Sequence, residues 1–340
     1  MLKKVLICLL VTASFLVGQI KTVSCWTAPT MSLEEAKKLS KFSLVIADLD
    51  NMSNNLESLI ELKRLNPSLR LVCYSNPMEI FDPSVSHRSR QNAWSQEIKS
   101  KYSDWMLNTK SGRKAVFFPG MRMLNMSSSC PLIDGQQYNE WMASLLVTKV
   151  LSVTDTTTGR RIWDGYFMDN CSPTISWVSN EDLIDIGPED IPELIDKSWS
   201  EGNREFLSII RQAMGDDFIL IGNKGVTEYR DLLDGRMFEW FPNDYVGAKL
   251  DGGWWQSIAN AAQTGPYTIF IVSPKDLDFG ILSSQMLDNV YVGVGINSLR
   301  WYKQFDQDLG EHGEVIILKK FSKKCIMITP AEKSAEILEE

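Results

Sequence analysis

Short runs of apolar residues recur along the chain, and each run ends in polar residues. The runs are rich in β-branched side chains and are nearly continuous, a pattern typical of strands in a parallel sheet whose two faces are both buried. The pattern therefore predicts a parallel sheet of eight strands, at residues 44–50, 71–76, 116–125, 165–170, 218–223, 236–241, 267–273 and 291–297.

Most of the intervals between these runs carry apolar residues at helical spacing. The sets include Leu56 and Leu59, Trp94 and Ile98, Trp141 and Leu145, Phe206 and Ile210, and Trp254 and Ile258. Strands that alternate with helices in this way predict a (β/α)8 TIM barrel. A doubly wound sheet is the alternative, but no G-x-G-x-x-G run follows a strand, so the main signal of a dinucleotide-binding sheet is missing.

The start of the chain has the features of an export signal. A basic segment precedes an apolar run at residues 5–17, which is shorter than the ~20 residues that a membrane-spanning helix needs. The small residues Thr22 and Ser24 follow, at positions that signal peptidases prefer. We therefore expect residues 1–24 to be a cleaved signal peptide and the protein to be extracellular, periplasmic or on the cell surface. A buried N-terminal helix is the alternative.

Residues 25–340 are expected to form a single TIM-barrel domain, because their length suits one large α/β barrel. Cys25 would be the first residue after the cut, which leaves open a lipoprotein with its lipid on Cys25. Beyond the eighth run, residues 315–318 and 325–329 flank a basic turn and predict an appended strand pair at about 311–330. No other stretch is apolar over the ~20 residues that a transmembrane segment requires.

The composition limits the classes of function that fit the chain. The chain has 43 acidic and 35 basic residues, for a net charge of -8. Nucleic-acid binders and binders of anionic membranes need a basic face, so this balance argues against both and suits a neutral or cationic substrate. The chain has 2 histidines, which argues against a histidine-based metal site and against a Ser-His or Cys-His mechanism. We expect no metal, no cofactor and a monomer.

Polar and aromatic residues gather where the predicted strands end. In a TIM barrel the carboxyl ends of the strands meet at one rim, and catalytic groups lie there. Carboxylates, amides and indoles around one cleft suit a sugar, because amides and carboxylates bind hydroxyl groups and sugar rings stack on indoles. The residues that we expect to bind a carbohydrate substrate are Asp48, Asp50, Tyr74, Asn76, Asn170, Asn223, Trp240, Trp255 and Asn297.

Asp169 and Glu239 are the best candidates for a catalytic carboxylate pair. Glu239 lies between Phe238 and Trp240. Apolar neighbours raise the pKa of a carboxyl group, so we expect Glu239 to be the general acid. Asp169 precedes the polar Asn170, and we expect it to be ionised and to act as nucleophile or base. The alternative for Asp169 is a helix N-cap, a common role for an aspartate at a strand end.

These motifs also carry a family resemblance. Residues 164–170 read Asp-Gly-Tyr-Phe-Met-Asp-Asn and resemble the fourth strand of the hypothetical glycosyl hydrolase group 15, which is related to the endo-α-1,4-polygalactosaminidase-like barrels. Residues 71–77 and 235–239 resemble the second and sixth strands of that group, and residues 325–330 resemble its final strand. The resemblance implies a TIM barrel with Asp169 and Glu239 as the catalytic pair.

Two classes of function are compatible with the sequence. The first is an exported glycoside hydrolase that acts on a polysaccharide or oligosaccharide, with retention of configuration favoured because the fourth and sixth strands are near neighbours on the rim. The second is a barrel that binds carbohydrate without cleaving it. A lyase or aldolase that forms a Schiff base on Lys224 is a third alternative. The first two classes differ in whether Asp169 and Glu239 point into one cleft.

Overall fold

Eight parallel strands form the central sheet of the computed structural model. Their order in the sheet is β1-β2-β3-β7-β9-β10-β11-β12, so each strand pairs with the next one of the sheet along the chain. All these pairings are parallel. The strands are β1 (Val23–Trp26), β2 (Leu44–Asp48), β3 (Arg70–Ser75), β7 (Gly165–Met168), β9 (Ile219–Asn223), β10 (Gly235–Phe238), β11 (Thr268–Val272) and β12 (Val290–Val294).

The first and last strands of the sheet meet and bring it close to a closed barrel. Thr22 forms a parallel bridge with Val292, and Cys25 forms one with Ile296. The backbone N–H of Val292 donates to the carbonyl oxygen of Lys21 at 2.9 Å across this seam. The (β/α)8 TIM barrel that the sequence predicts is therefore confirmed.

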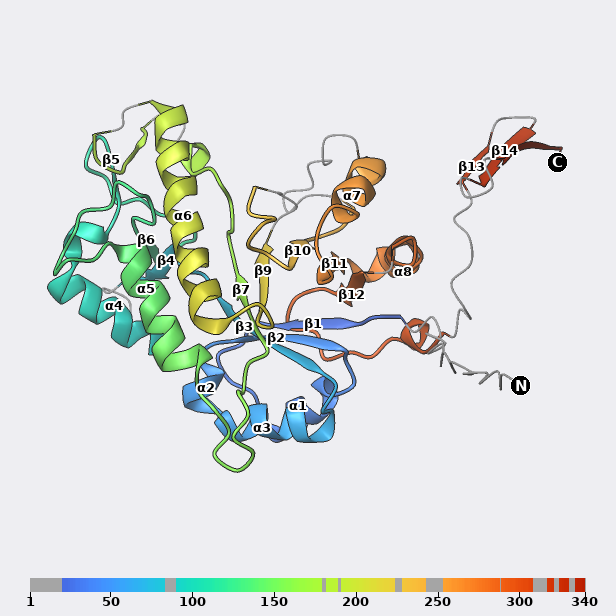
Figure 1. Ribbon diagram of the computed structural model, residues 1–340, viewed down its shortest axis with the longest axis horizontal. Coiled ribbons are helices and arrows are strands. Elements are labelled where there is room, and N and C mark those ends of the chain that lie inside the picture. The colour runs from blue at the N-terminus through green and yellow to red at the C-terminus, as the bar shows by residue number, and fades with distance from the viewer. Residues whose placement is uncertain are drawn as a thin grey trace, which may run out of the picture. The chain divides into compact units, whose positions relative to one another are not determined.

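Helices surround the strands, with α1 to α3 below them in Figure 1, α4 to α6 to the left and α7 and α8 to the right. The α-helices are α1 (Leu33–Leu39), α2 (Asn51–Asn54), α3 (Leu56–Leu65), α4 (Arg90–Lys101), α5 (Tyr138–Leu146), α6 (Pro192–Met214), α7 (Gly253–Ala261) and α8 (Leu277–Ser284). Short helices of other types are η1 (Ser103–Trp105), η2 (Val147–Leu151), η3 (Ser176–Val178), η4 (Pro274–Asp276) and η5 (Lys303–Asp306).

The ends of the helices follow from local sequence. Ser32 caps α1 with its hydroxyl, which accepts from the backbone N–H of Glu35 at 3.2 Å, and the Glu35 carboxylate accepts from the N–H of Ser32 at 2.7 Å. The long helix α6 starts with Pro192, whose missing N–H needs no partner in the first turn. It stops at Gly215, where φ is 85°.

Every second residue of the strands fills the interior of the barrel, because successive side chains of a strand point to opposite faces. The outward residues face the helices, as Tyr166 does against Phe206 of α6 at 6.0 Å between ring centroids. The interior cluster consists of Val23, Cys25, Leu44, Ile46, Val72, Phe167, Ile219, Ile221, Met237, Ile269 and Ile271. This register decides which residues at the strand ends face the axis of the barrel.

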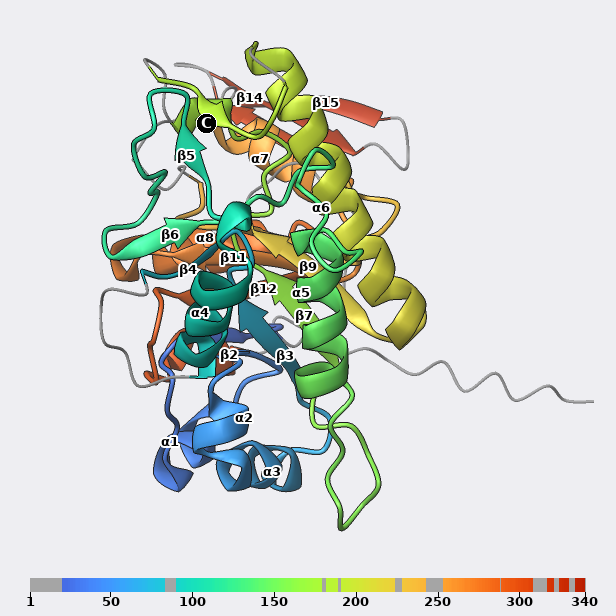
Figure 2. The same ribbon diagram turned by 90° about the vertical axis from the view of Figure 1, so that its left-hand side faces the viewer.

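A long insertion separates β3 from β7 and carries two small antiparallel sheets. One pairs β4 (Glu79–Phe81) with β6 (Met121–Met123), and the other pairs β5 (Asn108–Thr109) with β8 (Ile184–Asp185) of the loop after β7. Helix α4 packs against β4, as Figure 2 shows. The insertion follows the carboxyl end of β3, and the loop with β8 follows the carboxyl end of β7. Both therefore belong to the rim where catalytic groups of TIM barrels lie.

The C-terminal strands form an antiparallel sheet of their own. β13 (Ile317–Lys320) pairs with β14 (Lys324–Thr329), as the predicted strand pair requires, and β15 (Ser334–Glu339) pairs with the other edge of β14. The sheet therefore has one strand more than the sequence pattern predicts. It belongs to a compact unit that contains residues 302–340, whereas the barrel forms the unit of residues 21–301.

One predicted barrel strand is wrong. The pattern places a strand at residues 116–125, but this segment contributes only β6, which lies outside the barrel sheet. Pro119 and Gly120 interrupt the apolar run, and proline cannot donate to a central strand ladder. The side chain of Arg122 is buried and donates to Asn108 at 2.7 Å. The eighth strand of the barrel is β1, which the sequence pattern does not predict.

The structure describes residues 20–82, 90–178, 182–188, 191–223, 228–242, 253–287, 289–307, 317–320, 324–329 and 334–339. Among these residues no helix has the length and apolar character needed to cross a membrane. Most of the expected signal peptide lies outside the described residues. Because β1 begins at Val23, a cut directly after Ser24 would remove two residues of a barrel strand.

Candidate active site

On three neighbouring strands, the face that points into the barrel ends in a polar side chain at the rim. On β7, β9 and β10, an apolar residue of the barrel interior is followed two positions later by a polar residue on the same face. The polar residues are Asp169, Asn223 and Glu239, which follow Phe167, Ile221 and Met237 in that order. Alternation along the strands therefore brings these three side chains to one edge of the barrel.

Asn223 joins the two carboxylates of the predicted pair. Its side-chain Nδ2 donates to Asp169 Oδ1 at 2.7 Å and to Glu239 Oε2 at 3.2 Å. The two acceptor oxygens can be no further apart than the sum of these distances, about 6 Å. β9 lies between β7 and β10 in the sheet, which explains how one amide reaches a carboxylate on each flanking strand.

Asp169 is held by three hydrogen-bond donors. Besides Asn223, the hydroxyl of Tyr74 donates to Oδ2 at 2.5 Å and the backbone N–H of Asn170 donates to Oδ1 at 2.8 Å. Burial and the negative charge of Asp169 raise the pKa of Tyr74 well above its usual value, so the hydroxyl keeps its proton and remains a donor. Donors on both oxygens fix the orientation of the carboxylate.

Both carboxylates are followed by a residue with a left-handed backbone. The angle φ is 51° at Asn170 and 58° at Trp240. Asparagine tolerates this conformation, but a bulky residue adopts it at an energetic cost, and such strain clusters at functional sites. Each carboxylate directly follows the last residue of its strand and precedes the left-handed residue, which leaves it at the rim.

Asp164 fixes the amino end of β7. Its Oδ2 accepts from Nζ of Lys63 in α3 at 2.6 Å and from the backbone N–H of Leu71 in β3 at 2.8 Å. The next residue, Gly165, has no room for a side chain, because a Cβ there would overlap the carbonyl oxygen of Ile219 in β9. These contacts fix β7 against both neighbouring strands, and they therefore fix the position of Asp169 along the barrel axis.

Asp234 fixes the amino end of β10 in the same way. Its Oδ2 accepts from Nη2 of Arg211 in α6 at 2.6 Å and from the backbone N–H of Leu220 in β9 at 2.8 Å. Gly235 follows, and a Cβ there would overlap the carbonyl oxygen of Tyr267 next to β11. The two strands that carry the carboxylates therefore have matching supports at their amino ends.

Cys25 lies in the barrel interior close to the carboxylate pair. Its side chain is buried, and it belongs to the interior cluster. Burial, together with the charges of Asp169 and Glu239, raises the pKa of the Cys25 thiol, so the thiol stays neutral. A neutral buried thiol is a packing residue rather than a nucleophile.

Asp48 is a buried acid on β2, opposite Tyr74 of β3 in the strand register. Burial, together with the charge of Asp50, raises the pKa of Asp48 to about 7, although the backbone N–H of Asp50 donates to Asp48 Oδ1 at 2.8 Å. Within the described part of the chain, no group of three or more histidine, cysteine or acidic residues has an arrangement that could hold a metal ion.

Glu79 is a third carboxylate near the pair, and the strand-end pattern does not indicate it. Its Oε1 accepts from the backbone N–H groups of Phe117 and Phe118, both at 3.0 Å, and its Oε2 accepts from Asn76 Nδ2 at 3.2 Å. Burial raises the pKa of Glu79, and the charge of Asp169 adds to the shift. An acid between two apolar residues in the sequence is the signal that could have found it.

Two of the predicted substrate-binding amides support the loops of the rim. Asn297 Oδ1 accepts from the backbone N–H groups of Thr27 at 2.7 Å and Ala28 at 3.1 Å, which ties the loop after β1 to the loop after β12. Asn76 donates to Glu79. Both asparagines follow barrel strands and lie at the rim, and their contact with substrate stays a prediction.

The other predicted residues differ in burial. Asp50 and Asn170 are buried, which leaves little of their surface for a substrate. Trp240 is half-buried at the rim. Trp255 lies in α7, but its side chain is outside the described residues, and Lys224 is outside them altogether.

Several solved structures match most of the chain at low sequence identity. A maltogenic alpha-amylase from Thermotoga neapolitana matches with a TM-score of 0.49 at 8% identity, over 94% of this chain and 85% of that chain. Amy13B from Eubacterium rectale matches with a TM-score of 0.45 at 8% identity, over 92% of this chain and 82% of that chain. Xylanase B from Clostridium stercorarium F9 matches with a TM-score of 0.36 at 12% identity, over 82% and 86%.

The sequence itself matches a family model. No curated protein matches it significantly. The family model of hypothetical glycosyl hydrolase family 15 matches residues 63–278, a range that includes β3 to β11 and both carboxylates of the pair. The resemblance noted on the motifs of the fourth and sixth predicted strands is thereby confirmed, and the chain belongs to hypothetical glycosyl hydrolase family 15.

Proposed function

We propose that the chain is a glycoside hydrolase that cleaves a glycosidic bond of a polysaccharide or oligosaccharide with Asp169 and Glu239. The observation that carries the proposal is that both carboxylates accept hydrogen bonds from the one amide of Asn223. Glycoside hydrolysis needs two such groups beside one bond, one that donates a proton and one that is ionised near the anomeric carbon. Membership of the family supports the same chemistry.

Asp169 is the nucleophile in this proposal, and Glu239 is the general acid and base. Asp169 attacks the anomeric carbon while Glu239 gives its proton to the leaving oxygen, and the glycosidic bond breaks. Glu239 then takes a proton from water, and the resulting hydroxide displaces Asp169 from the sugar. The three donors on Asp169 support its role, because they hold its carboxylate in one orientation.

The closeness of the two carboxylates supports retention of configuration. Retaining enzymes place their carboxyl groups about 5–5.5 Å apart, whereas inverting enzymes leave about 6.5–9.5 Å for a water molecule. The two oxygens that share Asn223 are within about 6 Å of each other, which falls short of the inverting range.

A neutral or cationic glycan fits the charge of the rim. Asp48, Glu79, Asp169 and Glu239 all belong to this part of the barrel, and the charge of Asp169 contributes to the raised pKa of Glu79. An anionic sugar would add repulsion to a set of acids that already repel one another.

We also propose that the protein is exported, because the basic start and the short apolar run precede the barrel. The contacts of β1 favour a cut upstream of Ser24. Ser24 donates to the carbonyl oxygen of Ser298 at 3.0 Å within the barrel, and Cys25 is buried, so a lipid on that thiol would have no room. Cleavage before Lys21 would keep β1 together with the contacts of Lys21 and Thr22 with Val292. Mass spectrometry of the mature protein tests this, and a chain that keeps Met1 would contradict export by cleavage.

The direct test of the activity is a screen of the purified protein against amino-sugar polymers, galactosides and cell-wall glycans. New reducing ends are expected with at least one of these, and ¹H NMR of the first product is expected to show the anomer of the substrate. Loss of the signal in the Asp169→Asn variant ties cleavage to the site. A protein that binds one of the glycans but never cleaves it would be a carbohydrate-binding barrel.

A further inference from the structure

We propose that Trp177 is a binding platform for one pyranose ring of the glycan, beside the carboxylate pair. The inference rests on the proposed function for the identity of the ligand, which is the glycan that the pair cleaves. It adds a substrate-binding residue that the sequence pattern did not indicate, in a loop that follows the strand of Asp169.

Trp177 lies on the same side of the barrel as Asp169. It belongs to η3, in the loop after β7, and loops after barrel strands lie at the carboxyl-terminal rim. The carbonyl oxygen of Ser172, between the two residues, accepts from Nε1 of Trp199 and from Nδ2 of Asn203, both at 3.2 Å. The loop is therefore tied to α6 between Asp169 and the indole.

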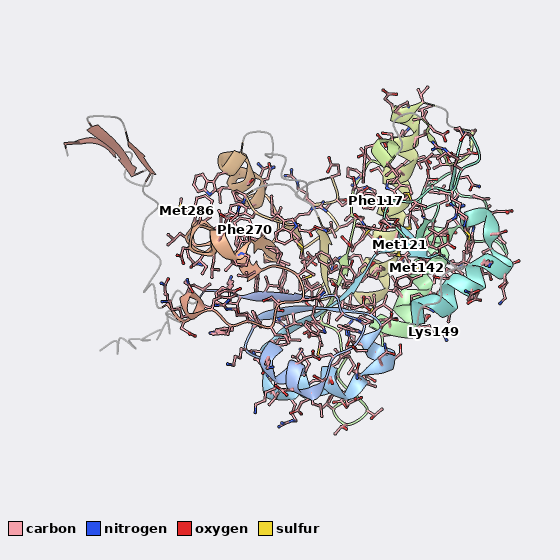
Figure 3. All side chains as sticks on the ribbon, turned by 180° about the vertical axis from the view of Figure 1, so that it is seen from behind. Phe117, Met121, Met142, Lys149, Phe270 and Met286 are labelled. Atoms are coloured by element: carbon pink, nitrogen blue, oxygen red, sulfur yellow. The ribbon has the colours of Figure 1, made fainter. Side chains whose placement is uncertain are left out.

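A second set of contacts connects Trp177 to the strand that supplies the hydroxyl donor of Asp169. The ring of Trp177 meets that of Phe117 at 5.1 Å between centroids and at 86°, and Figure 3 labels Phe117 on the part of the molecule that carries α5 and α6. The backbone N–H of Phe117 donates to Glu79, and Glu79 accepts from Asn76 at the end of β3. The indole is thus held to the rim from both β3 and β7.

The indole is exposed but fixed in orientation. Its Nε1 donates to the carbonyl oxygen of Thr174 at 2.9 Å. The backbone N–H groups of Ile175 and Ser176 donate to Asp196 of α6, both at 2.8 Å. Nevertheless, 37% of Trp177 is exposed. An exposed aromatic ring on a rigid support at the rim suits the apolar face of a sugar ring, and a ring that is already ordered loses little entropy on binding.

Affinity electrophoresis tests the platform through binding alone. The wild type, Trp177→Ala, Trp177→Phe and Leu65→Ala run in gels that contain chitosan, galactan or xylan. Leu65 is the matched control, because it is 39% exposed at the C-terminal end of α3, away from the rim. We expect one glycan to retard the wild type and Leu65→Ala equally, Trp177→Ala to lose the retardation, and Trp177→Phe to recover most of it. Circular dichroism of each variant checks that the fold is kept.

Kinetics on the same glycan provide the second measurement. With a long oligosaccharide, Trp177→Ala is expected to raise KM about tenfold and to leave kcat within about twofold, since a stacking contact binds ground state and transition state alike. The two proposals fail differently. Cleavage that is unaffected in Trp177→Ala overturns the platform and leaves the hydrolase intact. Retardation that depends on Trp177 without any cleavage supports the platform and overturns the hydrolase, and a protein that neither binds nor cleaves overturns both.

Discussion

Asp164 and Asp234 make the same pair of contacts at the amino ends of the two strands that carry the carboxylates. Each accepts one hydrogen bond from a basic side chain of a barrel helix at 2.6 Å and one from the backbone of a neighbouring strand at 2.8 Å. Each is followed by a glycine against which a neighbouring backbone packs. Because a strand is stiff, fixing its amino end also sets where the residue at its carboxyl end stands.

The first prediction is that Asp234→Asn destabilises the barrel. The variant keeps the size of the side chain but removes the charge that faces Arg211, and the pair is mostly buried, with 17% and 30% of the side chains exposed. We expect the free energy of unfolding to fall by about 1–2 kcal/mol, measured by urea denaturation.

Asp231→Asn is the control for that measurement. Asp231 pairs with Arg204 at the same 2.6 Å, but 61% and 42% of the two side chains are exposed. Its loss should cost less than about 0.5 kcal/mol. If both variants lost the same free energy of unfolding, the pair of Asp234 and Arg211 would contribute no more than an exposed ion pair.

The second prediction concerns the hydroxyl of Tyr74. Tyr74→Phe removes the donor to Asp169 but keeps the ring, which stacks on Phe167 at 5.8 Å between centroids. We expect kcat to fall about 10- to 100-fold with little change in melting temperature, because one preorganised donor to the reacting carboxylate is lost. Unchanged kcat would show that the hydroxyl does not serve Asp169 during turnover.

The third prediction compares kcat for two substitutions of Asn223, whose amide both carboxylates accept from. Asn223→Ala removes the donor, and Asn223→Asp also adds a negative charge between Asp169 and Glu239. Like charges at this distance repel and favour protonation of one carboxyl group. We expect Asn223→Asp to have the lower kcat, at least about 100-fold below the wild type. An aspartate variant with higher turnover than the alanine variant would contradict the bridging role.

The fourth prediction is a pH dependence of stability that belongs to Asp48. Its pKa rises on folding from the usual 3.8 to about 7. The folded protein therefore holds a proton that the unfolded chain releases, so this stability is present at low pH and is lost as the pH rises towards 7. Asp48→Asn mimics the protonated form and should match the wild type near pH 4 but exceed it at pH 8, by about 2–4 kcal/mol. A difference that is the same at both pH values would contradict the assignment.

Much of the barrel could be predicted from the sequence, because parallel strands buried on both faces leave continuous apolar runs. Asp169, Asn223 and Glu239 could be found because each stands where such a run ends. β1 could not, since its 4 residues follow an apolar N-terminal segment that has the features of an export signal. The predicted strand at residues 116–125 failed because an apolar run also suits an insertion that packs beside the barrel.

The residues that the pattern missed depend on contacts between distant segments. Glu79 approaches Asp169 only because the insertion after β3 folds back, with the backbone of Phe117 and Phe118 donating to its carboxylate. Trp177 is held by Phe117, which is far away in sequence. No local periodicity indicates such contacts. The repeated Asp-Gly at residues 164–165 and 234–235 is visible in the sequence, but the matching supports appear only with the fold.

The most direct test of the account is the turnover of Asp169→Asn and Glu239→Gln on a glycan that the wild type cleaves. Asp185→Asn, at an exposed position of β8, is the control. The account predicts that each substitution of the pair lowers kcat by at least about 1,000-fold, while Asp185→Asn stays within about twofold of the wild type and all three variants keep their melting temperatures. Near-normal turnover in either Asp169→Asn or Glu239→Gln would contradict the catalytic carboxylate pair.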